Sequence, residues 1–131
     1  MKIYESGENY LETIFMLEKR KGAVRSIDVA TELGFSKPSV SVAMKHFREN
    51  GYIVMDAEGY ITLTEAGKEI AARIYERHQL LTKYLIALGV DTQVAQEDAC
   101  KLEHDLGEES FARLRAHYEQ HLQPEDGAAE R

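Results

Sequence analysis

The chain of 131 residues has a single cysteine, no tryptophan and two prolines. One cysteine cannot form an internal disulfide, and this scarcity is typical of a protein from a reducing compartment. No apolar run reaches the roughly 20 residues that a membrane-spanning helix needs, and residues 1–6 lack the apolar centre of a signal peptide. The composition therefore predicts a cytoplasmic globular protein with no membrane contact, made of one compact unit or two small ones.

Positive charge is also scarce, and the formal net charge is −7. A protein of this charge binds nucleic acid only where a local patch is favourable. The acid is unevenly distributed: residues 1–70 hold 9 Lys/Arg against 11 Asp/Glu, whereas residues 71–131 hold 7 against 12. A first half that binds DNA is thus compatible with the composition, and its non-specific binding is expected to be weak.

The most clearly marked helix runs from Ser36 to Asn50. Ser36 is a favourable N-cap, Pro38 lies in the first turn where a missing N–H costs nothing, and Gly51 is a stop signal. Helical spacing predicts a buried face formed by Val40, Ala43, Met44 and Phe47.

The opposite face of this helix carries small, hydroxyl-bearing or cationic side chains, which suit the major groove of DNA. An ordinary amphipathic helix with a solvated face is the alternative. The candidate DNA-binding residues are Ser36, Lys37, Pro38, Ser39, Ser41, Val42, Lys45 and Arg48.

The flanking segments favour the DNA-binding alternative. Helices are expected over 7–20 and 27–33, the second capped by Ser26 with Ile27 directed inward, and Gly34 makes the turn into the next helix. After Gly51 the period changes to 2, which predicts a β-hairpin over 52–63. This order is that of a winged helix-turn-helix, a module that binds DNA or, alternatively, is reused for protein contacts.

The second half is predicted to be entirely helical, which makes the fold mainly α. A long helix capped by Thr64 reaches about Leu88, and two more end near Gly107 and Leu122. We expect a winged-helix domain over 1–64, a linking helix and helical domain over 65–122, and a disordered tail over 123–131. So small a helical unit needs a partner for its apolar faces, and a homodimer is the simplest one.

Candidate metal ligands gather near the end of the helix before Gly107. Cys100, Glu103 and His104 are spaced i, i+3 and i+4, so they share one helical face. Sulfur, carboxylate and imidazole together are typical ligands of a transition metal. Each alone is more commonly a core thiol or a solvated polar side chain. Three residues of other helices could complete the set if the helices converge: Asn9, Glu12 and His78.

Five stretches resemble the metal-dependent repressors typified by the diphtheria toxin repressor and the manganese transport regulator. They are residues 8–14, 36–41, 63–67, 77–78 and 99–104, and the resemblance covers about residues 7–118. It implies a divalent cation, Fe²⁺ or Mn²⁺ (with Zn²⁺ or Co²⁺ in vitro), between a DNA-binding unit and a dimerisation unit. The ligands that it implies are Glu12, His78, Cys100, Glu103 and His104.

This sequence departs from the family pattern at several positions. Asn9 is a weaker ligand than the usual residue, and Cys100 is the choice of iron-type members, although Glu12 and His78 match manganese-type members. Thr82 and Gln96 are poor ligands where iron-type members have a second site. One strong site per subunit is therefore expected.

The resemblance implies a metal-activated DNA-binding transcriptional regulator, a repressor of metal-homeostasis genes, that binds a double-stranded DNA operator as a homodimer. The metal would fix the spacing of the two Ser36–Asn50 helices. The alternative is a winged-helix regulator controlled without metal, by a protein, by a small ligand or by oxidation of Cys100. An enzyme is not expected, since no hydrolytic triad or glycine-rich phosphate loop is visible.

Overall fold

The computed structural model describes residues 3–123, so the predicted tail lies outside the described residues from position 124 onward. Two compact units make up the chain, and the first ends at Tyr75 where the second begins at Glu76. This division falls inside the long helix α4 (Glu65–Ala87). Between residues 3 and 123, every helix is too short or too polar to cross a bilayer.

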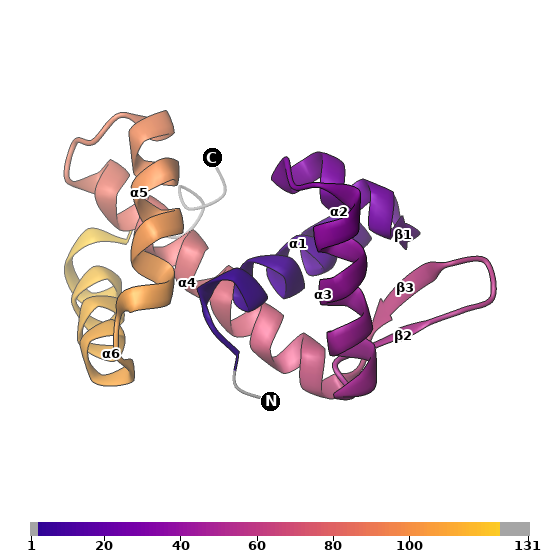
Figure 1. Cartoon of the computed structure of the whole chain (residues 1–131). Helices are drawn as coiled ribbons and strands as arrows, with labels where there is room; N and C mark the ends of the chain where they lie inside the picture. The colour runs from indigo at the N-terminus through magenta and orange to yellow at the C-terminus, as the bar shows by residue number, and fades with distance from the viewer. Residues whose placement is uncertain (1–2, 124–131) are drawn as a thin grey trace. The chain divides into compact units, whose positions relative to one another are not determined.

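The first unit is the predicted winged helix-turn-helix. Figure 1 shows the hairpin β2–β3 projecting beyond the helices of this unit as a wing. The predicted order of helices, turn and hairpin is confirmed. Its elements are α1 (Glu5–Lys21), β1 (Val24–Arg25), α2 (Ser26–Leu33), α3 (Lys37–Glu49), β2 (Ile53–Met55), β3 (Tyr60–Leu63) and the start of α4.

Helix α3 begins and ends where the sequence predicts. The Ser36 hydroxyl accepts a hydrogen bond from the Ser39 backbone N–H at 3.3 Å, and Pro38 lies in the first turn. Asn50 is the C-cap, and Gly51 follows with a φ of +81°, which other residues rarely adopt. Of its predicted inward side chains, Val40, Met44 and Phe47 are almost fully buried, whereas Ala43 is only partly buried.

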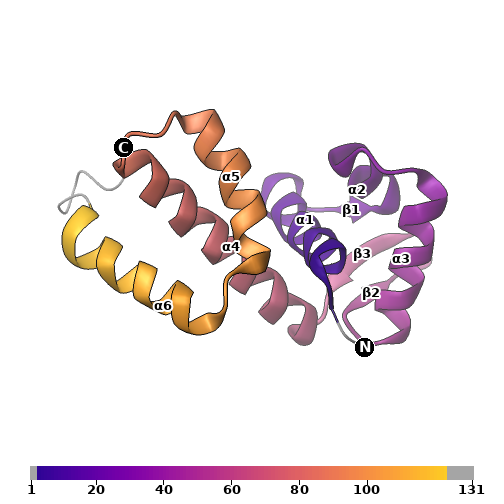
Figure 2. The same ribbon diagram turned by 60° about the vertical axis from the view of Figure 1, so that its left-hand side comes forward.

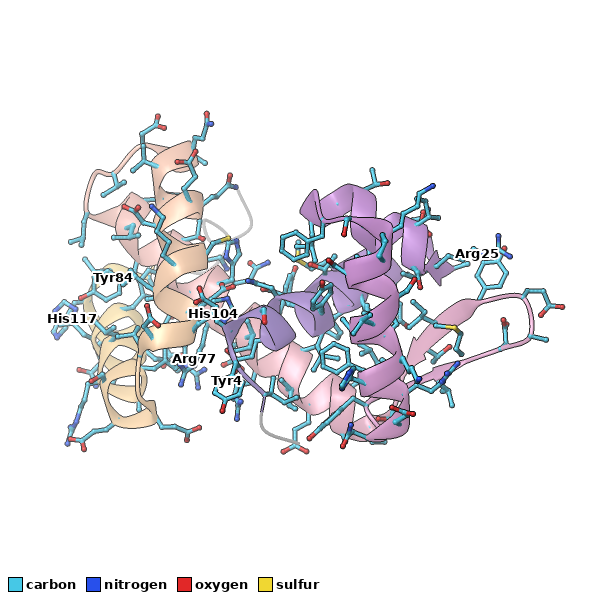
Figure 3. All side chains as sticks on the ribbon, in the orientation of Figure 1. Tyr4, Arg25, Arg77, Tyr84, His104 and His117 are labelled. Atoms are coloured by element: carbon cyan, nitrogen blue, oxygen red, sulfur yellow. The ribbon has the colours of Figure 1, made fainter. Side chains whose placement is uncertain are left out.

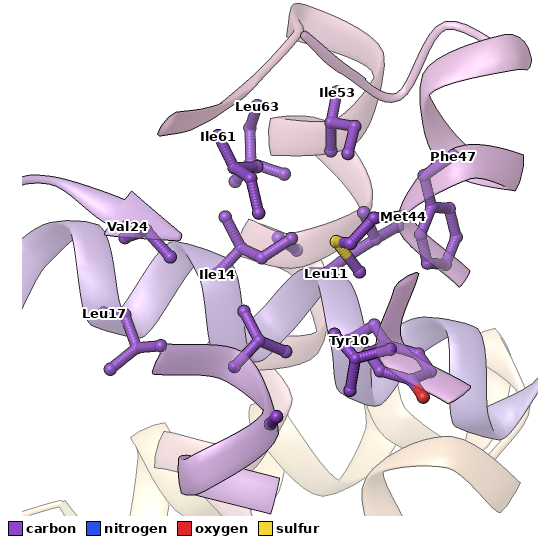
Figure 4. Close-up of a cluster of buried hydrophobic side chains, with 14 residues drawn as sticks. Tyr10, Leu11, Ile14, Leu17, Val24, Met44, Phe47, Ile53, Ile61 and Leu63 are labelled. Carbon is purple, nitrogen blue, oxygen red and sulfur yellow. The ribbon is translucent and has the colours of Figure 1, made fainter. Parts of the chain in front are cut away.

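Those α3 side chains belong to a core that gathers every element of the first unit. In Figure 4, Met44 and Phe47 of α3 lie against Leu11 of α1, and Ile53 and Leu63 come from the sheet. The core fixes which face of α3 is left outside.

Three details of the first unit differ from the expectation. Ser26, predicted as the N-cap of α2, is its first residue, and Arg25 occupies the N-cap position. Strand β1 was not predicted, because two residues are too short to show a period; it forms by antiparallel pairing of Val24 with Ile61 in a sheet of order β1-β3-β2. Ile27 is 46% exposed, so its predicted inward direction is wrong. The buried stripe of α2 is centred on Val29 and Ala30, which turns Ile27 outward.

The second unit consists of the rest of α4, α5 (Thr92–Asp105), α6 (Glu108–His117) and η1 (Tyr118–Leu122). Figure 2 shows α5 and α6 lying along α4. The core is small, with Leu81, Ala99 and Phe111 as its buried members. The final helix reaches Leu122 as predicted, but its last turn widens to a π-helix.

A close backbone contact at Gly67 holds the start of α4 against the first unit. A Cβ at this position would lie 2.2 Å from the carbonyl oxygen of Tyr52, which also accepts a hydrogen bond from the Thr64 N–H at 3.1 Å. The carbonyl therefore cannot move away without breaking that bond.

We predict that Gly67→Ala lowers the free energy of unfolding by about 1–3 kcal/mol, as overpacking does. Urea denaturation measures the change, with Lys68→Ala, an exposed position of the same turn, as the matched control. A gain of about 1 kcal/mol, the usual effect of Gly→Ala in an open helix, would contradict the prediction.

Candidate metal centre and candidate DNA-binding helix

Helix α5 directs one short stripe of side chains toward the interior of the second unit. The Asp91 carboxylate caps its start by accepting from the Gln93 N–H at 3.1 Å. From there Ala95, Ala99 and Glu103 recur every four residues, and all three are buried. The two small alanines leave the carboxylate of Glu103 as the one large polar group of this stripe.

The structure brings together the ligand atoms of His78 on α4 with those of Cys100 and Glu103 on α5. His78 Nδ1 lies 3.0 Å from Glu103 Oε2 and 3.7 Å from Cys100 Sγ. All three ligand atoms lie within 4.8 Å of one another. Transition metals bond to such atoms at about 2.0–2.3 Å, so a nitrogen, a sulfur and an oxygen here have the spacing that one cation requires.

Glu103 is the most constrained member of this group, with an exposed fraction of 0%. Its second oxygen, Oε1, lies 3.3 Å from Nε2 of His104, whose side chain is 1% exposed. A buried carboxylate is costly unless positive charge or hydrogen-bond donors accompany it. His78 provides such a donor at Oε2, the His104 ring lies beside Oε1, and a bound cation would provide the charge directly.

The charge state of His78 follows from the same contacts. The hydrogen bond of the His78 side chain to Cys100, followed in size by its hydrogen bond to Glu103, raises the pKa of His78 to about 10. Without a metal, His78 is therefore a cation at pH 7 and donates its Nδ1–H. A metal ion must displace that proton, and its own charge then replaces the charge of the imidazolium.

This shift predicts a pH-dependent stability of the metal-free chain. A pKa raised on folding stabilises the folded state fully below the unfolded value of about 6.5, and the stabilisation is lost as the pH rises toward about 10. With chelator present, the free energy of unfolding should fall between pH 7 and 10, and His78→Gln should flatten that fall. Urea denaturation at each pH measures this free energy. As a control, His121→Gln, at an exposed histidine of the same unit, should keep the wild-type dependence of stability on pH. Equal slopes for all three proteins would contradict the prediction.

The remaining predicted ligands, Asn9 and Glu12, lie on α1 in the first unit, spaced i, i+3. Glu12 is buried, unlike most carboxylates. At the positions where iron-type members have a second site, Gln96 is exposed on α5 and the Thr82 hydroxyl is buried on α4. Participation of Asn9 and Glu12 in the metal site stays a prediction.

All eight candidate DNA-binding residues on or next to α3 are exposed, and Val42 is 58% exposed. The structure adds neighbours that the sequence reasoning missed. Ser26 and Ile27 of α2 line a hollow of about 200 Å³ together with Lys37 and Ser41. The helical spacing of Ile27 predicts a core position, and only the phase of α2 in the structure shows that this side chain faces outward.

Arg25 of β1 places a cation against the wing, which the sequence did not indicate. The Arg25 guanidinium stacks on the Tyr60 ring, 4.6 Å from its centroid, and donates to the Glu58 carbonyl (Figure 3). This contact places a positive charge beside a turn whose own side chains are acidic. The acidic wing is thus less repulsive to DNA than its sequence suggests.

Comparison with known proteins gives family matches over both halves of the chain. A family profile described as "Iron dependent repressor, N-terminal DNA binding domain" matches residues 2–61. A second, "Iron dependent repressor, metal binding and dimerisation domain", matches residues 64–127.

Relatives and solved structures agree with these profiles. The transcriptional regulator MntR of Escherichia coli O6:H1 (strain CFT073) is 33% identical over 87% of this chain and 74% of its own. The regulator MntR of Bacillus subtilis (strain 168) is 33% identical over 83% of this chain and 77% of its own. The crystal structure of the metal-dependent transcriptional regulator MtsR has a TM-score of 0.78 at 29% identity, over 86% of this chain and 53% of its own. A manganese-dependent transcriptional repressor in complex with manganese has a TM-score of 0.76 at 27% identity, over 83% of this chain and 50% of its own. This chain therefore spans about half the length of these solved structures.

Proposed function

Because the chain belongs to the iron-dependent repressor family, we propose that it is a DNA-binding transcriptional regulator activated by a divalent metal ion, Fe²⁺ or Mn²⁺. The observation that carries the proposal is the convergence of His78, Cys100 and Glu103 from two helices. Control of metal-homeostasis genes by repression is the role that the family relationship supports.

The metal would be held by His78, Cys100, Glu103 and His104 of the second unit, with Glu12 and Asn9 of α1 as the ligands from the first. Bound there, the cation would supply the positive charge that the Glu103 carboxylate requires. Cys100 gives the site a soft donor, which favours Fe²⁺ over Mn²⁺ relative to an all-oxygen and nitrogen site.

A second copy of the chain would complete the regulator. The second unit exposes Ile86, Leu88, Val94 and Leu102, with exposed fractions from 39% to 61%. Val94 and Leu102 are eight residues apart on α5, on a stripe that borders its buried stripe. The family profile that matches this unit describes a dimerisation domain. A two-fold dimer presents two α3 helices, as a DNA site with two half-sites requires.

Helix α3 would enter the major groove with its exposed face. Lys37, Lys45 and Arg48 would bind phosphates, while Ser39, Ser41 and Val42 would lie near base edges. Val42 has no polar atom in its side chain, so it would favour an apolar partner such as the methyl group of thymine.

The central test is a titration of Fe²⁺ or Mn²⁺ into metal-free protein while binding to DNA from its own upstream region is followed. We expect activation of about 5–150-fold, the usual range of allosteric coupling. Cys100→Ala combined with His104→Ala should abolish it, because two metal donors are lost. Gln96→Ala, at an exposed polar position of the same helix, should leave it unchanged. DNA binding that ignores metal but is lost on oxidation of Cys100 would overturn the metal switch and favour the alternative.

Substitutions on α3 should separate phosphate contacts from base contacts. Lys45→Ala should weaken metal-activated binding to every DNA sequence and reduce its dependence on log salt concentration by about 0.9. Val42→Asn should instead change base preference at one position and leave the salt dependence intact. Binding isotherms at several salt concentrations on randomised sites measure both. An unchanged salt dependence in Lys45→Ala would contradict the proposed contact of α3 with the DNA phosphates.

A further inference from the structure

One buried cation of the second unit takes no part in the metal site described above. Arg77 is only 6% exposed, and it precedes His78 directly on α4. Its Nη1 donates to two backbone carbonyl oxygens at the end of α5, those of Glu103 at 3.2 Å and Leu106 at 2.6 Å. The side chains of Arg77 and of His104 on α5 are labelled in Figure 3.

The carbonyls that Arg77 binds are among those that a helix leaves unpaired at its C-terminus. The partial negative charge there attracts a cation, and a guanidinium can donate to two oxygens at once. One of the two belongs to Glu103, whose side chain faces His78. A single turn of α4 therefore provides a metal ligand, His78, and the group that holds the backbone of its partner ligand.

We propose that Arg77 is a positioning residue of the metal centre: by binding the C-terminal carbonyls of α5, it sets the distance between Glu103 and His78. The proposal rests on the metal-binding function proposed above. Burying a guanidinium is costly, and its side chain would be replaceable by an apolar one if it only filled space. Groups that orient metal ligands typically change metal affinity by about 10–100-fold when removed.

The chain contains a matched control for this residue. Arg115 and Arg77 both lie against the Phe111 ring, with their guanidinium carbons 4.8 and 4.9 Å from its centroid. Arg115 is more exposed and forms an ion pair with Glu76 on α4, and its hydrogen bond goes to that side chain instead of to α5. Loss of stacking on Phe111 is common to substitutions at both sites, whereas loss of the α5 carbonyl contact is specific to Arg77.

The test uses the full chain and Co²⁺ as the probe, because thiolate and d–d absorption bands report the number and geometry of its ligands. Arg77→Gln should raise the dissociation constant for Co²⁺ by about 10–100-fold and shift the d–d bands of the bound form. Arg115→Gln should keep both close to the wild type. Arg77→Lys, which retains the charge and one donor direction, should recover part of the affinity.

A second measurement is independent of metal. In the apo protein, the amides in the last turn of α5 should exchange faster with solvent in Arg77→Gln and Arg77→Lys than in the wild type, with Arg115→Gln unchanged. Unaltered Co²⁺ affinity and spectrum in Arg77→Lys and Arg77→Gln, or equal losses in Arg115→Gln, would overturn the inference. A wild-type chain without a Co²⁺–thiolate band would instead refute the proposed metal site, and the exchange data would still decide whether Arg77 holds α5.

Discussion

The need to balance a buried carboxylate governs the second unit. Glu103 is fully enclosed, and the imidazoles of His78 and His104 lie at its two oxygens. In the metal-free chain the charge comes from the His78 imidazolium, whose pKa Cys100 and Glu103 raise. A divalent metal ion would bring a larger positive charge and would accept bonds from several directions. The metal-free and metal-bound states can therefore share one arrangement of α4 and α5. They differ in whether a proton or a metal ion is bound to His78.

The small core of this unit explains why polar contacts matter so much there. Its buried apolar members are few, centred on Leu81, Ala99 and Phe111. Such a core contributes only a few kcal/mol, so backbone contacts such as those of Arg77 and burial against a second copy become important. Helix α4 links this unit covalently to the winged helix, since it supplies Ala71 to one core and Leu81 to the other.

Local signals predicted the first unit well where they agreed with one another. Ser36, Pro38 and Gly51 marked both ends of α3, and the period of its apolar residues identified the face that the core of α1 and the sheet covers. The prediction failed where a local pattern was ambiguous. Ile27 fitted an inward stripe by spacing alone, but Val29 and Ala30 set the phase of α2. Strand β1 depends on pairing with β3, which is remote in sequence.

The sequence by itself determined the kinds of ligand and their helical spacing, because Cys100, Glu103 and His104 share a face of any helix that contains them. It also determined the exposed, cationic and hydroxyl-bearing face of α3. Only the tertiary structure decided that His78 meets this set, that Glu103 is buried, and that Arg77 binds the end of α5. Those contacts join residues at least 22 positions apart, and their distances depend on how two helices pack, which no local pattern encodes.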